Sequence, residues 1–166
     1  MRTLAVLAVL MIAALPARAG AQDIGLPIGA TPEAASVEDL DGAAVDLARY
    51  VGKKPVLFEF WATWCELCAA LEPRLQAAKR TYGDRVDFVI VAVGVGQNPR
   101  SIRRHLEDHT TAGPVLYDAK GAAVRAFKAP TTSYVVVLDA AGKVAYTGTG
   151  GNQDIARALA RVVGSH

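Results

Sequence analysis

Two cysteines separated by two residues, Cys65 and Cys68, are the only cysteines in the sequence. At this spacing their sulfur atoms can form a disulfide within about one turn of a helix. One thiolate can attack a disulfide of another molecule, and the second can resolve the mixed disulfide by attacking the first sulfur. Two soft thiolates can also bind copper(I) without redox turnover. The pair therefore indicates either thiol-disulfide exchange or metal binding.

The segments on either side of the pair favour exchange. An almost continuous apolar run from Pro55 to Trp61 predicts a strand covered on both faces. A helix is predicted from Cys65 to Tyr82, because apolar residues recur at helical spacing at Leu67, Leu71, Leu75 and Ala78. The first turn of a helix has unpaired N–H groups and the positive end of its dipole, which favour a thiolate. We therefore expect Cys65 to be the nucleophile and Cys68 the resolving cysteine.

The other segments predict an α/β domain with a central mixed sheet and helices on both faces. Expected strands are 36–40, 86–93 and 115–117, and the pair 133–138 and 143–147 is expected to form a hairpin. Expected helices are 99–109 and 153–163, with shorter helical segments at 45–50 and 122–127.

The N-terminal residues have the pattern of a signal peptide. Arg2 precedes an apolar run of about 12 residues, and small residues end it near Ala19. The run is shorter than the roughly 20 residues that span a bilayer. We expect a signal peptide over 1–19, a linker or loose arm over 20–35 and one domain over 36–166. This organisation predicts a periplasmic protein, anchored to the membrane only if the first segment is retained.

Composition excludes several classes of partner and site. Without Arg2 and Arg18, the 18 Lys and Arg residues fall to 16, equal to the 16 Asp and Glu residues. This balance gives no electrostatic basis for nucleic-acid binding. Two cysteines are too few for a four-cysteine zinc site or a disulfide-stapled fold. No metal site is expected from the histidines either, since His105 and His109 fall in a charged helical segment and are expected to be solvated.

The segment around the cysteines resembles a known active-site signature. The residues Phe60-Trp61-Ala62-Thr63-Trp64-Cys65-Glu66-Leu67-Cys68 are similar to that of thioredoxin-like proteins, and most of all to the exported TlpA/ResA/DsbE group. Weaker matches continue at Asp41-Gly42, Gly52-Lys53-Lys54-Pro55, Pro114 to Asp118, Ala129-Pro130-Thr131-Thr132 and Leu138 to Gly142.

The resemblance implies a thioredoxin fold and a thiol-disulfide oxidoreductase. Its expected role is reduction of exported proteins that carry disulfides, such as apocytochromes or copper-site assembly factors. The redox-active disulfide would serve without any further cofactor, and a membrane thiol electron donor would re-reduce it. The alternative function is a copper(I)-binding assembly chaperone that uses the same two thiolates.

The resemblance also implies roles for residues outside the pair. Glu59 would be a buried acid beneath the cysteines that moves the Cys68 proton, with a raised pKa. Ala129 with a cis Pro130 would bind substrate by strand addition. Independently of the resemblance, we expect Trp64 to shape the groove around Cys65 and to bind substrate. The group more often has an acid three residues after the second cysteine, where this chain has Leu71. We expect the next residue, Glu72, to be solvated.

The two residues between the cysteines are expected to tune the redox potential. A carboxylate at Glu66 disfavours the neighbouring thiolate by like-charge repulsion. A less stabilised reduced form makes the pair more reducing, so Glu66 predicts a reductant. Leu67 replaces the proline that many relatives have, with an effect of unknown sign.

Overall fold

The structure is a computed structural model that describes residues 25–164, so the expected signal peptide lies outside the described residues. The strands are β1 (Ser36–Glu38), β2 (Ala44–Asp46), β3 (Val56–Trp61), β4 (Asp87–Val93), β5 (Val115–Asp118), β6 (Tyr134–Leu138) and β7 (Val144–Gly148). The helices are α1 (Glu66–Tyr82), α2 (Pro99–Asp108), α3 (Ala122–Ala126) and α4 (Ile155–Val163), with a 3-10 helix at Leu47–Tyr50.

The strands form one mixed sheet in the order β2-β1-β5-β4-β3-β6-β7. The three central strands β5, β4 and β3 are parallel, and β6 is antiparallel to β3. All six residues of β3 are buried, as its apolar run predicts. The expected fold class, a thioredoxin fold with helices on both faces of a mixed sheet, is confirmed.

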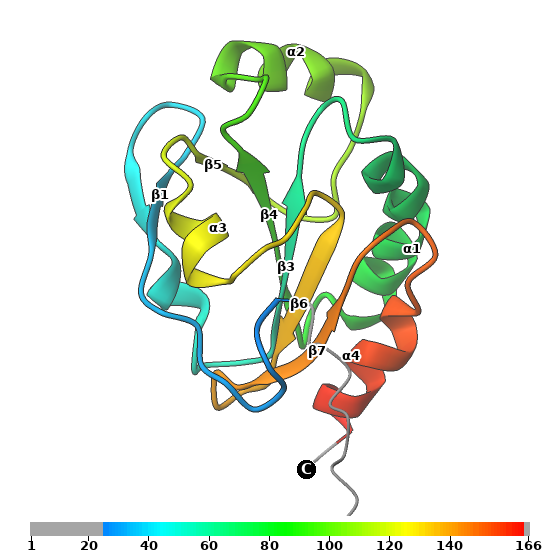
Figure 1. Cartoon of the computed structure of the whole chain (residues 1–166). Helices are drawn as coiled ribbons and strands as arrows, with labels where there is room; N and C mark the ends of the chain where they lie inside the picture. The colour runs from blue at the N-terminus through cyan, green and yellow to red at the C-terminus, as the bar shows by residue number, and fades with distance from the viewer. Residues whose placement is uncertain (1–24, 165–166) are drawn as a thin grey trace, which may run out of the picture.

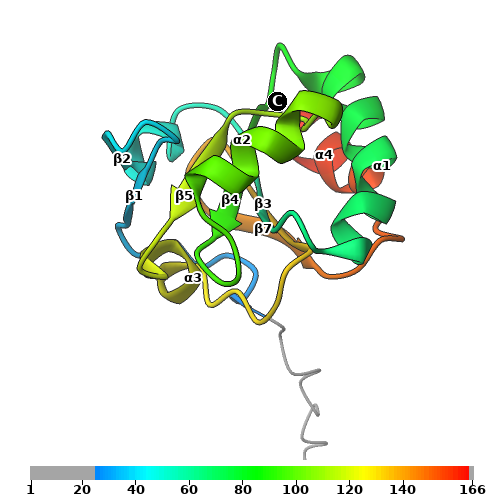
Figure 2. The ribbon, with the colours of Figure 1, turned by 90° about the horizontal axis from the view of Figure 1, so that it is seen from above.

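Helices cover both faces of the sheet, with α1 and α4 on one side and α3 on the other (Figure 1). One apolar cluster joins the α1 and α4 side to the sheet through residues that include Leu57, Leu71, Leu75, Val135 and Leu159. The opposite cluster includes Phe58, Phe60, Phe127 and Tyr134. Seen from above, α2 crosses over the ends of the central strands beside α1 (Figure 2). This end of the sheet carries the cysteines.

The segment before β1 is packed on the domain, whereas a loose arm is expected from its composition. Leu26 is buried, and its N–H donates to the Tyr134 hydroxyl at 3.2 Å. Gly29 donates from its N–H to the carbonyl of Val144 at 2.7 Å. Gly25 has φ +86°, and a Cβ there would collide with the Tyr134 hydroxyl. The expectation for residues 25–35 is therefore wrong, because contacts with distant strands order a segment that has no periodicity of its own.

A second difference lies at residues 44–50, where a helical turn is expected from Val45. The structure has the strand β2 first and the 3-10 helix after it. Pairing with β1 at Val37 and Val45 explains the strand, because short strands are stabilised by their partner more than by their own sequence. Among residues 25–164, no helix is both long and apolar enough to span a membrane.

Candidate active site

The cysteine pair lies where β3 passes into α1, as predicted. Cys65 is the N-cap residue of α1 and is joined to Cys68 by a disulfide with a Cα–Cα distance of 5.2 Å. Cys65 is 8% exposed and Cys68 is 1% exposed. Cys65 is therefore the more exposed of the two cysteines, which fits its expected role as the nucleophile.

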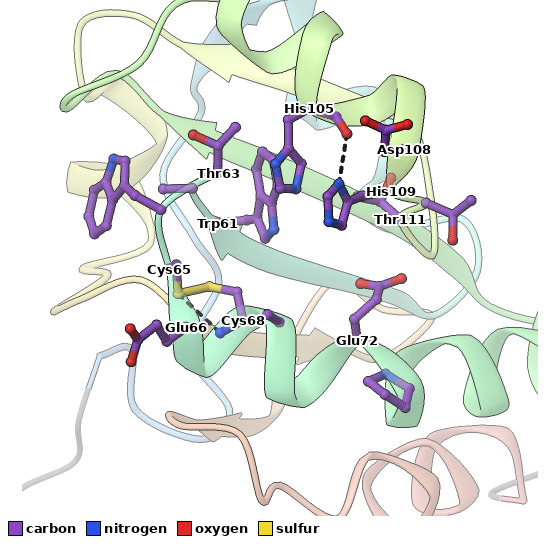
Figure 3. A pocket seen from close by; sticks show the side chains of 15 residues that line it. Trp61, Thr63, Cys65, Glu66, Cys68, Glu72, His105, Asp108, His109 and Thr111 are labelled. Atoms are coloured by element: carbon purple, nitrogen blue, oxygen red, sulfur yellow. Dashed lines mark hydrogen bonds between the residues drawn. A yellow bond between two sulfur atoms is a disulfide. The ribbon is translucent and has the colours of Figure 1, made fainter.

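The start of α1 also provides a hydrogen bond to the Cys65 sulfur. The backbone N–H of Cys68 donates to Cys65 Sγ at 3.1 Å (Figure 3). In the reduced protein, this donor and the helix dipole would stabilise negative charge on Cys65. Cys65 is thus favoured as the thiolate by its position at the start of α1, and it is also the more exposed of the two cysteines.

A pocket of about 570 Å³ opens beside the disulfide, between α1 and α2. Its lining combines the redox pair with aromatic and acidic side chains (Figure 3). The residues around it are Trp61, Ala62, Thr63, Trp64, Cys65, Glu66, Cys68, Ala69, Glu72, Pro73, His105, Asp108, His109, Thr110 and Thr111. The pocket brings Trp64 and Glu66 to the cysteines, but Glu59, Leu67, Ala129 and Pro130 do not line it.

Glu59 is completely buried in the middle of β3, between Ile90 and Val135 of the neighbouring strands. Neither carboxyl oxygen has a hydrogen-bond partner among the described residues. Burial raises the pKa of Glu59 well above its usual value, and the nearby Glu72 raises it further. A carboxyl with a raised pKa can hold a proton and exchange it during a reaction. The raised pKa and the burial expected for Glu59 agree with the structure.

Glu72 is not the solvated side chain expected from the sequence. It is half-buried, lines the pocket and accepts a hydrogen bond from Gln76 Nε2 at 2.7 Å. Burial raises the pKa of Glu72 to about 7, against the lowering effect of the Gln76 bond. The helical repeat explains the difference, because a residue four positions after Cys68 lies on the same side of α1. Glu72 thus belongs to the site.

His105 and His109 both line the pocket. His109 is exposed, as expected, whereas His105 is half-buried. Their rings stack with centroids 4.1 Å apart, and the His105 ring contacts Trp61 edge-on at 5.4 Å. Burial, followed by the neighbouring His109, lowers the pKa of His105. Within residues 25–164, no group of three or more His, Cys, Asp or Glu side chains could hold a metal ion.

Comparison with known proteins shows the family to which this chain belongs. A family model described as redoxin matches residues 27–162. The chain belongs to the redoxin family. The Bacillus subtilis thioredoxin-like protein YneN is 29% identical to this redoxin over 126 residues, which are 74% of this chain and 72% of YneN.

Two further relatives carry names that describe disulfide chemistry. The thiol-disulfide oxidoreductase ResA of Oceanobacillus iheyensis is 30% identical over 101 residues, which are 59% of this redoxin and 52% of ResA. A structure of a secreted Mycobacterium tuberculosis disulfide oxidoreductase aligns with a TM-score of 0.65 and 22% identity, covering 76% of this chain and 94% of that one. The expected resemblance and the enzyme class, thiol-disulfide oxidoreductase, are thereby supported by family and by named relatives.

The loop before β6 differs from the expectation in one respect. All peptide bonds of the described residues are trans, so the expected cis bond before Pro130 is absent. The loop turns instead through left-handed backbone at Lys128, with φ 48°, and at Ser133, with φ 60°. The Ser133 N–H donates to the Phe60 carbonyl at 2.8 Å, which ties the loop to the strand that leads to the cysteines. Ala129 packs on the apolar cluster that contains both cysteines, and Pro130 is exposed.

Three expected site residues are exposed around the start of α1 in this redoxin. Trp64 is 52% exposed and donates from Nε1 to the Val95 carbonyl at 3.0 Å, while Leu67 is 55% exposed. Glu66 is also exposed. Their positions are compatible with substrate contact at Trp64 and with redox tuning at Glu66 and Leu67, which remain predictions.

Gln97 is a buried site residue that the sequence analysis did not identify. Its Oε1 accepts from the Thr63 N–H at 2.9 Å, and its Nε2 donates to the Val93 carbonyl at 2.7 Å. The side chain therefore joins the end of β4 to the turn that precedes Cys65. Nothing in the local pattern after β4 marks Gln97, since its partner Thr63 is 34 residues away in the sequence.

Proposed function

We propose that this redoxin reduces disulfides of exported proteins in the periplasm. The observation that carries the proposal is the arrangement of Cys65 and the more deeply buried Cys68 at the start of α1, with the buried, unpartnered Glu59 in the adjoining strand β3. Cys65 can attack a disulfide, Cys68 can resolve the mixed disulfide, and the Glu59 carboxyl can take part in proton transfer.

The proposed reaction starts from the reduced pair. The Cys65 thiolate attacks one sulfur of the partner's disulfide, forming a mixed disulfide and releasing one partner thiolate. Cys68 then loses its proton to the Glu59 carboxylate and attacks Cys65 Sγ. The bond between Cys65 and the partner breaks, and the second partner sulfur leaves as a thiolate. Two electrons pass to the partner, and the chain is left with the disulfide seen in the structure.

The direction of the reaction and its compartment rest on two further arguments. Glu66 places a carboxylate beside Cys65, which favours a reducing pair by destabilising the thiolate. The signal-like N-terminal pattern supports export, in agreement with the description of the mycobacterial relative as secreted. Substrates would be exported proteins such as apocytochromes or copper-site assembly factors, and a membrane thiol donor would regenerate the reduced pair.

Turnover of a protein disulfide tests the proposal against copper(I) binding. We expect the reduced mature domain, with dithiothreitol as the electron source, to accelerate insulin reduction over dithiothreitol alone. The alternative predicts stoichiometric binding of copper(I) by the reduced form with no acceleration. Insulin reduction at the background rate would contradict the proposed reductase.

A further inference from the structure

The pocket beside the disulfide has a one-sided charge. Its lining contains the carboxyl groups of Glu66, Glu72 and Asp108, and it contains no lysine or arginine. The ion pairs of the described residues join Lys54 to Asp87 and Arg103 to Asp41, so neither neutralises a pocket acid. Thiol-disulfide exchange does not itself require this excess of negative charge.

The other walls of the pocket suit the stem and head of a long cationic side chain. Trp61, Ala69 and Pro73 give apolar or aromatic surface, and the stacked imidazoles of His105 and His109 lie on the α2 side. Aromatic rings attract cations, and the methylene stem of lysine or arginine packs on apolar surface. A volume of about 570 Å³ has room for such a side chain.

Glu59 provides an independent reason for a cation at this place. Its carboxyl is fully buried and unpartnered, and it interacts electrostatically with Glu72 on the pocket wall. Proton transfer from Cys68 requires Glu59 in its ionised form. A positive charge in the pocket would favour that form while substrate is bound, because opposite charges at short range stabilise ionisation.

We propose that the pocket between α1 and α2 binds a lysine or arginine side chain of the substrate protein, near its target cysteine. The inference rests on the proposed function, since it names the kind of protein segment that the reductase selects. Recognition would place the cationic side chain against Asp108 and Glu72 while Cys65 attacks the neighbouring disulfide.

Peptide substrates of one sequence test the proposal. Each carries a single cysteine joined to 2-mercaptoethanol, with lysine, glutamine or glutamate two residues away, and the reduced protein is the reductant. We expect the second-order rate constant for reduction to be about tenfold higher for the lysine than for the glutamate peptide at low salt, with glutamine between them. Each rate is divided by the rate with dithiothreitol, which removes differences in intrinsic reactivity. The preference should weaken in 0.5 M salt.

Two variants separate the pocket from general charge effects. Asp108→Asn removes a pocket carboxylate and should reduce the lysine preference several-fold, whereas Glu107→Gln removes the neighbouring exposed acid outside the pocket and should leave it unchanged. The preference should also decline below a pH of about 7, where Glu72 becomes protonated, and further at lower pH as His105 gains charge. Equal normalised rates for the three peptides, or equal effects of the two variants, would overturn the inference alone. Failure to reduce any peptide would overturn the proposed function with it.

Discussion

Replacing Cys65 with serine is expected to lower disulfide exchange by about a thousandfold or more, because the attacking sulfur is lost. Replacing Cys68 with serine should leave the first attack intact and stop the reaction at the mixed disulfide. The difference follows from exposure, since Cys65 is 8% and Cys68 1% exposed. A non-reducing gel of each variant incubated with a protein disulfide should show a covalent adduct only for Cys68→Ser.

The two cysteine variants control for one another. Both remove the same disulfide, so a loss of stability would affect them alike. An adduct that forms with Cys65→Ser, or full activity of that variant, would show that another group is the nucleophile.

Replacing Glu59 with leucine is expected to stabilise the protein and slow the resolving step. An unpartnered buried polar group costs about 1–3 kcal/mol, so Glu59→Leu should raise the free energy of unfolding by about that amount at pH 8. Loss of a general acid or base typically lowers a rate by about 100-fold or more. Urea unfolding and single-turnover release of the mixed disulfide measure the two effects.

The pH dependence of the free energy of unfolding should also differ between the wild-type protein and the Glu59 variant. The folded protein holds the Glu59 proton more tightly than the unfolded chain, because the pKa of Glu59 is raised well above 4.5. This contribution to stability is fully present below a pH of about 4.5 and is lost as the pH rises through the folded-state pKa. Glu59→Leu should lack this pH-dependent contribution of Glu59. The raised pKa of Glu72 should make stability fall as the pH rises to about 7 in both proteins.

Glu59→Gln is the matched control, because it keeps the shape and polarity but cannot exchange a proton. It should slow resolution as much as leucine does, with a smaller gain in stability. Unchanged resolution in both variants would exclude Glu59 from proton transfer.

The redox pair and Glu59 could be predicted from sequence because their signals are local. Cys65 and Cys68 occupy a strand-to-helix junction whose two periodicities are clear, and Glu59 interrupts an otherwise apolar strand. A carboxyl at such a position is conspicuous, because burial without a partner is costly.

Glu72 and Gln97 could not be predicted in the same way. The helical repeat predicts that Glu72 lies on the same side of α1 as Cys68. The pocket beside Glu72, however, forms only when α2 packs across the end of the sheet. Gln97 acts through a hydrogen bond to Thr63, a contact that depends on the parallel pairing of β3 and β4. The ordered segment at 25–35 depends in the same manner on distant strands.

The reduction potential of the Cys65–Cys68 pair tests the proposed reductase most directly. It can be measured on the mature domain by equilibration with glutathione or dithiothreitol buffers at fixed pH. We expect a value near or below about −250 mV, close to that of thioredoxin, because Glu66 disfavours the reduced thiolate. A value above about −150 mV, toward the strongly oxidising end, would contradict a reductant and indicate a protein that introduces or rearranges disulfides.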